Sequence, residues 1–157
     1  IGEGVVDKPI DTIATAITLG ARAEDLAKLD LAYAPPFSMA MSSTIVTANV
    51  ILNKMNKSME SAKAPELKVM MEKGSVNVLD VREEEEFFIS SIPGSKNIPM
   101  GELEVRIDEI DKNKETIILV CRIGKRAYMS YLKLKNLGFT NLKVLEGGVC
   151  AYPYELE

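Results

Sequence analysis

The stretch "ILVCRIGKRAYMSYLKLKNLG", Ile118 to Gly138, decides the fold class. An aliphatic run ends at Cys121, a short loop containing Gly124 follows, and Arg126 to Leu137 then show a helical pattern that Gly138 closes. A buried strand that passes directly into a helix is the repeating unit of a parallel sheet covered by helices.

The same alternation extends to both sides of this stretch. The segments "VNVLDV" and "NLKVLEGG" read as short buried strands, "APELKVMMEKGS" as a helix that begins near Pro65 and ends at Gly74, and "GELEVRIDEIDKNK" (101–114) as an amphipathic helix. We therefore predict an α/β fold, a parallel sheet flanked by helices. The segments "DVRE", "CRIGKR" and "EGGVCAY" follow strands, so they should share the carboxyl edge of the sheet, where ligands bind.

Bulk composition excludes several classes of function. The net charge is −4 and no long basic run is present, which argues against binding to nucleic acid or acidic lipid. The most apolar stretch, Met39 to Leu52, is too short and too polar to span a membrane. Histidine is absent, which excludes Cys-His and Ser-His-Asp catalysis and any His-ligated metal site. We predict no metal site.

Length, cysteine count and the first residue indicate organisation and compartment. A chain of 157 residues holds one ordinary domain and an appendage. Two cysteines are too few for a disulfide framework, which favours a reducing compartment, by default the cytoplasm. Because the chain begins at Ile1 without an initiator methionine, we expect a fragment or a processed product.

Residues 1–57 have a helical pattern. Two short helices separated at Gly20 are predicted in "DTIATAITLGARAEDLAKLDLAY", and "YAPPFS" predicts a turn. A further helix should then carry an apolar face made of Ile45, Ala48, Leu52, Met55 and Met59. This face has no obvious partner in residues 65–157, so we expect it to associate with another surface. Residues 58–64 are polar and are interpreted as a linker.

Cys121 is the candidate nucleophile. A loop that turns into a helix directs unpaired backbone N–H groups at one point, and Arg122, Lys125 and Arg126 add positive charge, so a thiolate is favoured without histidine. Cations are poorly placed for the dipole at a helix start, which indicates that an anion is bound there. The alternative is an inert packed cysteine beside a solvated helix start. The rival function is a non-catalytic dimerisation and docking module whose loop only binds an anion.

Four motifs give the second half of the chain a family resemblance. Residues 65–157 resemble a single-domain rhodanese, a sulfurtransferase, through "VLDVREEEEF", "SIPGSKNIP", "CRIGKRA" and "LEGGVCAY". The resemblance implies a persulfide intermediate on Cys121, a thiosulfate, polysulfide or persulfide donor, and a thiol acceptor. It also implies that the sulfane sulfur is cradled by the loop Cys121, Arg122, Ile123, Gly124, Lys125 and Arg126. Two positions depart from the family pattern, Ser91 for the usual histidine and Tyr152 for the usual tryptophan, and neither is catalytic in the family.

The same fold resembles the dual-specificity phosphatases, which use Cys-x5-Arg. Here Arg126 follows Cys121 after four intervening residues. A shorter loop suits a sulfur atom better than a phosphate group, so phosphatase activity is not expected.

Residues 1–57 carry a second resemblance. The segments "GVVDKPIDTIATAI" and "DLAKLDLAYAPPFS" are similar to the C-terminal dimerisation region of pyridine nucleotide-disulfide oxidoreductases, in the branch of coenzyme A-disulfide reductases and NADH oxidases. This implies a homodimeric fusion protein that uses FAD, NAD(P)H and coenzyme A. The similarity departs at "MAMSSTIVT". No dinucleotide fingerprint follows Gly2 and Gly4, because Asp7 stands where a third glycine should be, so we expect no cofactor in this chain alone.

Four further features are interpreted separately. Asp80 and Arg82 should form a structural ion pair or backbone bonds at a strand end, or else support the active loop. The run Glu83–Glu86 should be a solvated helix start. Cys150 is a packed small residue or a resolving thiol that attacks the persulfide. Tyr33 is interpreted as a packing residue, with contact to coenzyme A as the alternative.

Overall fold

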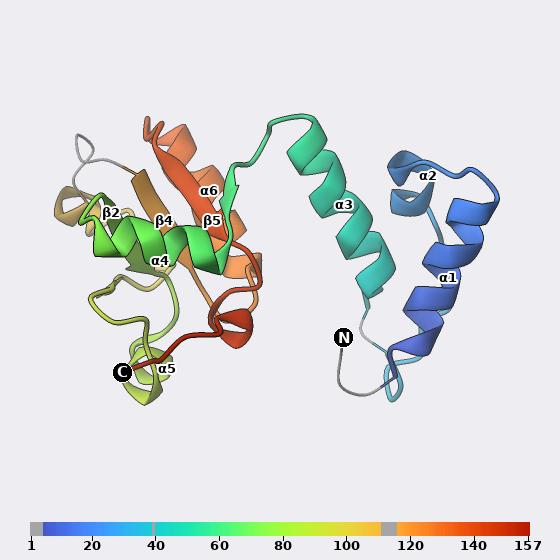
Figure 1. The fold of residues 1–157 in the computed structure, drawn as a ribbon, viewed down its shortest axis with the longest axis horizontal. Helices are drawn as coiled ribbons and strands as arrows, with labels where there is room; N and C mark the ends of the chain where they lie inside the picture. Colours follow the sequence, from blue (N-terminus) through green and yellow to red (C-terminus); the bar gives the residue numbers. More distant parts are fainter. Residues whose placement is uncertain (1–4, 39, 111–115) are drawn as a thin grey trace. The chain divides into compact units, whose positions relative to one another are not determined.

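The computed structural model describes residues 5–38, 40–110 and 116–157. The chain divides after Ser58 into two compact units, which are described separately (Figure 1).

The first unit is helical, as predicted. Its helices are α1 (Asp7–Thr18), α2 (Ala23–Ala27) and α3 (Ser43–Met55). Gly20 lies at φ +74° between the first two, which accounts for the predicted break. Helix α3 packs against α2 and α1, yet among the described residues of this unit only Thr44 and Ala48 are buried.

The predicted apolar face of α3 is wrong at its end. The helix stops at Met55, because Lys57 has a positive φ of 52° that a helix cannot continue through. Met59 is buried in the core of the second unit instead. Met55 is 64% exposed. Tyr33 is 54% exposed in this chain, so the packing interpretation and the alternative of a coenzyme A contact both stay predictions.

The second unit is built on a five-stranded parallel sheet, which confirms the predicted fold class. Its strands are β1 (Ser61–Ala62), β2 (Val76–Asp80), β3 (Lys96–Asn97), β4 (Thr116–Val120) and β5 (Leu142–Leu145), in the order β1-β5-β4-β2-β3. The interpretation of residues 58–64 as a linker is wrong for β1, which pairs with β5 and buries Ala62 at the sheet edge.

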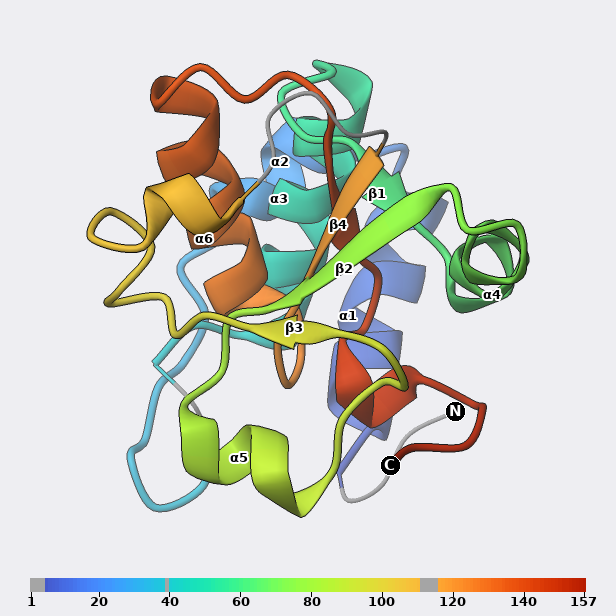
Figure 2. The ribbon, with the colours of Figure 1, turned by 90° about the vertical axis from the view of Figure 1, so that its left-hand side faces the viewer.

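Helices cover both faces of this sheet, as Figure 2 shows for α4 (Ala64–Glu72) and α6 (Lys125–Asn136). Alternate residues of β4 reach opposite layers: Ile117 and Leu119 join the core under α6, while Ile118 and Val120 join the core under α4. A strand that is buried on both faces explains the unbroken aliphatic run in the sequence.

The helix predicted over 101–114 is wrong within the described part of that segment. Residues 101–106 form turns, a single 3-10 turn, η1 (Ile107–Glu109), follows, and residues 111–114 lie outside the described residues. Leu103 and Ile110 are buried, but Val105 is 83% exposed, so the apolar residues do not form one helical face.

Among the described residues, none of the helices has both the length and the hydrophobicity of a membrane-spanning segment.

Candidate active site

The loops that follow β2, β4 and β5 meet at the carboxyl edge of the sheet, as the sequence predicts. Asp80 pairs with Val120 at the ends of β2 and β4, and β5 ends at Leu145 on the other side of β4. This arrangement brings together Cys121, the start of α6 and the glycine pair after β5.

Cys121 leaves β4 and its sulfur faces the start of α6. The residue is only 1% exposed, and the backbone N–H of Gly124 donates to Sγ at 3.1 Å. Gly124 has φ +103° and caps α6, as expected for a glycine that closes a sharp loop. Helix α6 begins at Lys125, so the last two residues of the predicted six-residue loop form its first turn. A backbone donor at a helix start is the environment that favours a sulfur anion.

The residues that follow the glycine pair after β5 hydrogen-bond to the backbone of this loop. The N–H of Val149 donates to Cys121 O at 2.9 Å, and the N–H of Cys150 donates to Arg122 O at 3.0 Å. Gly148 allows this approach, since a Cβ there would overlap Cys121 O and lie 2.6 Å from Arg122 O. Both carbonyl groups are thereby held in hydrogen bonds, which fixes the peptide planes of the loop.

The three basic residues differ in their partners. Arg122 and Lys125 are exposed, and among the described residues neither makes an ion pair. Arg126 makes two hydrogen bonds to the carboxylate of Glu86, at 2.5 and 2.7 Å. These bonds raise the pKa of Arg126, with a smaller contribution from the nearby Cys121 sulfur, and hydrogen bonding to Arg126 lowers the pKa of Glu86.

The interpretation of the acidic run as a solvated helix start therefore needs a correction. Glu83 caps α5 (Glu84–Ile89), and Glu84 and Glu85 are exposed, as expected. Glu86, however, reaches across to the active loop. The charge pattern could have predicted this contact, because the acidic run and the basic loop both follow strands at the same edge of the sheet.

Asp80 and Arg82 form the expected ion pair, and both side chains are buried. Arg82 contacts Asp80 through Nε at 2.9 Å and Nη2 at 2.6 Å, and Nη2 also donates to Ser90 O at 2.7 Å, at the end of α5. Asn97 of β3 donates to the backbone oxygens of both residues. The pair thus connects β2, β3 and the helix that carries Glu86, a connection that sequence reasoning did not predict.

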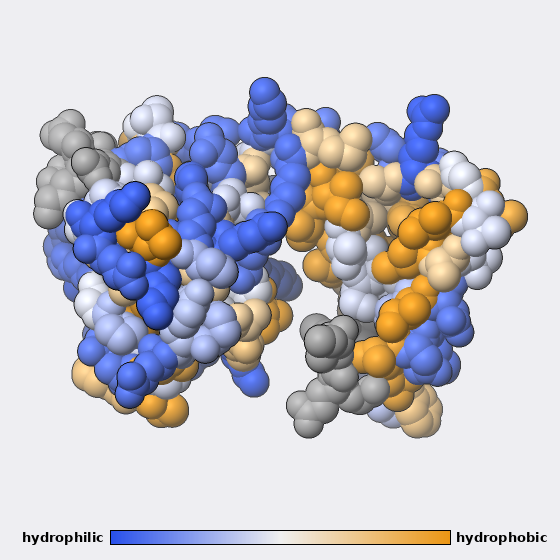
Figure 3. All heavy atoms as spheres, in the orientation of Figure 1, coloured by the Kyte–Doolittle hydropathy of each residue, from blue (hydrophilic) through white to orange (hydrophobic). Residues whose placement is uncertain are grey.

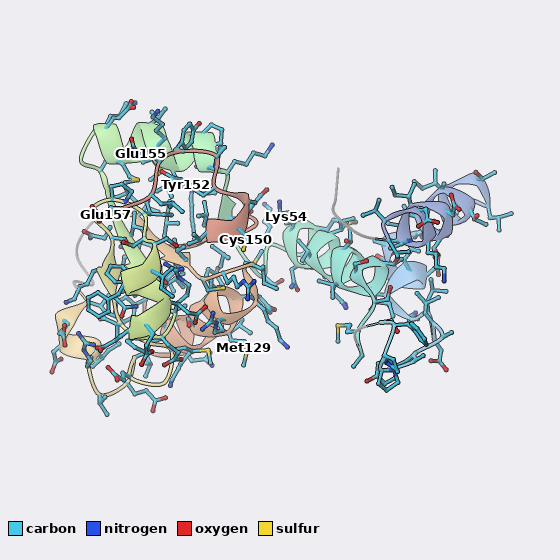
Figure 4. The ribbon with its side chains drawn as sticks, turned by 90° about the horizontal axis from the view of Figure 1, so that it is seen from below. Lys54, Met129, Cys150, Tyr152, Glu155 and Glu157 are labelled. Carbon is cyan, nitrogen blue, oxygen red and sulfur yellow. The ribbon has the colours of Figure 1, made fainter. Side chains whose placement is uncertain are left out.

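Cys150 lies on the exposed side of η2 (Val149–Ala151), where Figure 4 labels it. Its backbone contacts the loop through Arg122 O, and both cysteines are free thiols. The packed interpretation of Cys150 does not fit its exposure; a resolving role stays a prediction.

The two positions that depart from the family pattern both contact the C-terminal segment. Ser91 exchanges two backbone hydrogen bonds with Glu157, at 2.7 and 2.9 Å. Tyr152 contacts Tyr154 edge to face with ring centroids 5.3 Å apart, and burial raises the pKa of Tyr152.

Two surface hollows lie elsewhere in this unit. One lies between Lys68 and the Tyr152–Tyr154 pair, and the other lies beside β2 and Lys96; neither is lined by Cys121. Among the described residues no group of three or more Cys, Asp or Glu side chains could hold a metal ion.

Comparison with known proteins identifies the class that this fold and site define. The rhodanese-like domain family matches residues 63–152, more than half of the chain, and the chain therefore belongs to the rhodanese family.

Two solved structures match both units. The reduced CoADR-RHD protein of Bacillus anthracis is 34% identical with a TM-score of 0.88 over 96% of this chain, and the NAD-dependent persulfide reductase from A. fulgidus is 42% identical with a TM-score of 0.84 over 98%. The thiosulfate:glutathione sulfurtransferase of Homo sapiens is 30% identical over 96 residues, 53% of this chain and 84% of that enzyme.

The chain spans 27% and 26% of the two solved structures, and between 20% and 35% of three further curated relatives. The predicted resemblance to a rhodanese is confirmed, and the CoADR-RHD protein and the persulfide reductase are similar to this chain over both of its units.

Proposed function

We propose that this chain transfers sulfane sulfur through a persulfide on Cys121. The observation that carries the proposal is the hydrogen bond from Gly124 N–H to the Cys121 sulfur at the start of α6. A buried thiol that receives a backbone donor, close to Arg126, is arranged to carry negative charge on sulfur without a histidine.

The chemistry needs no oxidant. The Cys121 thiolate attacks the sulfane sulfur of thiosulfate, a polysulfide or a persulfide, a new S–S bond forms, and the donor's S–S bond breaks. The leaving group departs with the electron pair: sulfite from thiosulfate, a shorter polysulfide or hydrosulfide anion from a polysulfide, and a thiolate from a persulfide. A thiol acceptor then attacks the outer sulfur and regenerates the Cys121 thiolate.

The second part of the proposal concerns the role of this chain within a longer protein. We propose that this chain is the C-terminal part of a flavin-dependent reductase of coenzyme A-disulfide, coenzyme A-persulfide or polysulfide, with coenzyme A as a candidate thiol acceptor. The match to the persulfide reductase over both units supports this role. FAD and NAD(P)H would be held by other segments, because this sequence has no dinucleotide fingerprint. Free thiols suit a reducing compartment such as the cytoplasm.

We also propose that the first unit mediates a homodimer. Figure 3 shows apolar side chains spread over its surface. Ile17, Leu19 and Phe37 of this unit are 68%, 80% and 90% exposed. Exposed apolar surface of this extent is typical of interfaces. Light scattering over a range of concentrations should show a dimer, and a strict monomer would remove this part of the proposal.

The sulfur transfer is tested by intact mass. Incubation with thiosulfate or a persulfide should add about 32 Da, a thiol should remove it, and Cys121→Ser should gain nothing. Trypsin cleaves after Arg122 and after Lys143, so Cys121 and Cys150 fall in different peptides. The adduct should map to the peptide that ends at Arg122. If no donor class loads the protein, the rival function as a non-catalytic dimerisation and anion-docking module is favoured.

A further inference from the structure

The positive charges of the Cys121 loop are not equally available to a substrate. Arg122 and Lys125 are exposed and, among the described residues, unpaired, whereas Arg126 is held by two hydrogen bonds to Glu86. The Arg126 and Glu86 side chains are 28% and 33% exposed, so the pair is partly accessible to solvent.

Arg126 lies in the first turn of α6, whose capping residue Gly124 donates its backbone N–H to the Cys121 sulfur. The electrostatic influence of the cysteine sulfur contributes to the raised pKa of the guanidinium, after the larger contributions from Glu86. Glu86 thus cancels a charge that would otherwise attract an anion to the reacting sulfur.

Because donor classes differ in charge, this cancellation has a chemical consequence. Thiosulfate carries two negative charges and transfers its outer sulfur with sulfite as the leaving group. A low-molecular-weight persulfide such as cysteine persulfide carries about one negative charge overall and releases a thiolate. A neighbouring carboxylate therefore penalises thiosulfate more than the persulfide.

We propose that Glu86 determines the donor preference of the Cys121 loop, favouring singly charged persulfides over doubly charged thiosulfate. This inference rests on the proposed sulfur transfer and deepens it. It assigns Glu86 as a specificity-determining residue and indicates that the upstream reaction supplies sulfur as a persulfide.

Two variants, each of which removes one partner of the ion pair, distinguish a charge effect on donor preference from a structural effect. Glu86→Gln removes the negative partner and leaves Arg126 free to attract an anion. Arg126→Gln removes the positive partner and leaves the carboxylate of Glu86 unopposed. A merely structural pair would give both variants the same change in donor preference, whereas a charge effect gives opposite changes.

The measurement is the rate of persulfide formation on Cys121 with thiosulfate and with cysteine persulfide, followed by intact mass at low ionic strength. The ratio of the thiosulfate rate to the persulfide rate should rise about three- to tenfold in Glu86→Gln and fall by a similar factor in Arg126→Gln. The double variant should lie near the wild-type ratio. The control Glu85→Gln, an exposed acid of the same helix turn, should change the ratio less than twofold. Raising the salt concentration should reduce the differences in this rate ratio between the variants and the wild type.

The inference is overturned if both single variants shift the ratio in the same direction, or if neither shifts it beyond the Glu85→Gln control. If the proposed sulfur transfer itself is wrong, the wild-type protein should load no sulfur from either donor. This outcome is distinct from a loss of donor preference.

Discussion

Replacing Gly148 with alanine should displace the Cys121 loop. Gly148 has φ +60° and ψ −157°, a region that is essentially restricted to glycine. The added Cβ would overlap the carbonyl oxygen of Cys121 and lie 2.6 Å from Arg122 O and 2.7 Å from Arg122 C. These are backbone atoms, so no side-chain rotation relieves the overlap.

The expected cost follows from three contributions. The backbone conformation costs about 1–3 kcal/mol for a residue with a Cβ. Forcing atoms into a closely packed contact costs about 1–3 kcal/mol. Moving the loop away weakens the bonds from Val149 N–H and Cys150 N–H, each worth about 1 kcal/mol. We expect Gly148→Ala to lower the free energy of unfolding by about 4 kcal/mol.

Gly138→Ala is the matched control. Gly138 also has a positive φ, of 90°, but a Cβ there would meet nothing within 4 Å, so only the backbone cost of about 1–2 kcal/mol remains. Urea unfolding followed by tyrosine signals suits both variants, because four of the five tyrosines lie in Met59–Glu157. With a slope of about 2 kcal/mol per M, the midpoint should fall by roughly 2 M in Gly148→Ala and by under about 1 M in the control.

Sulfur loading should separate the two variants further. Gly138→Ala should load at the wild-type rate, while Gly148→Ala should load at least about tenfold more slowly, because a misplaced nucleophile loses its orientation. Equal midpoints and equal loading rates in the two variants would refute the assignment of Gly148 as the support of the loop.

Three further predictions concern the neighbouring charges and thiol. Asp80→Asn leaves the buried Arg82 without its counter-ion and should cost about 3–5 kcal/mol in urea unfolding; an unchanged midpoint would contradict the structural role of the pair. Arg126 lowers the pKa of Glu86, so the ion pair stabilises the fold above the ordinary carboxyl pKa, and this stabilisation is lost as the pH falls through the lowered value. Glu86→Gln should accordingly be less stable than wild type in urea at neutral pH and equal to it in acid, and a pH-independent difference would argue against this linkage. Cys150→Ser should form the persulfide at the wild-type rate but discharge it more slowly if this thiol resolves it, whereas equal discharge rates in the two proteins would leave Cys150 without that role.

The strands and helices around the nucleophile could be predicted because each is specified locally. The aliphatic run of β4 is buried on both faces, and Gly124 and Gly138 mark the two ends of α6 by their positive φ. The edge strands β1 and β3 could not be predicted in this way. Each is two residues long, and only pairing with a neighbouring strand defines it.

The failed helix over 101–114 shows the limit of periodicity. Its charged residues satisfy one another locally in the turn that forms: Arg106 contacts both Glu102 and Glu109, and Glu109 also pairs with Lys96. Spacings of three and four residues between opposite charges suit a turn with 3-10 character as well as an α-helix, so the charge pattern did not discriminate between them.

The candidate site was predicted at Cys121 and missed at Glu86 for a related reason. Glutamates at a helix start are already accounted for by the dipole, so the acidic run gave no local reason to look for a distant partner. Glu86 and Arg126 are 40 residues apart, and they meet because β2 and β4 are adjacent parallel strands whose following helices begin at the same edge. In a sheet of this kind, the charges after one strand act on the chemistry after its neighbour. The donor preference of the thiol is therefore a property of two strand-to-helix junctions, and a comparison of loop sequences alone would not predict it.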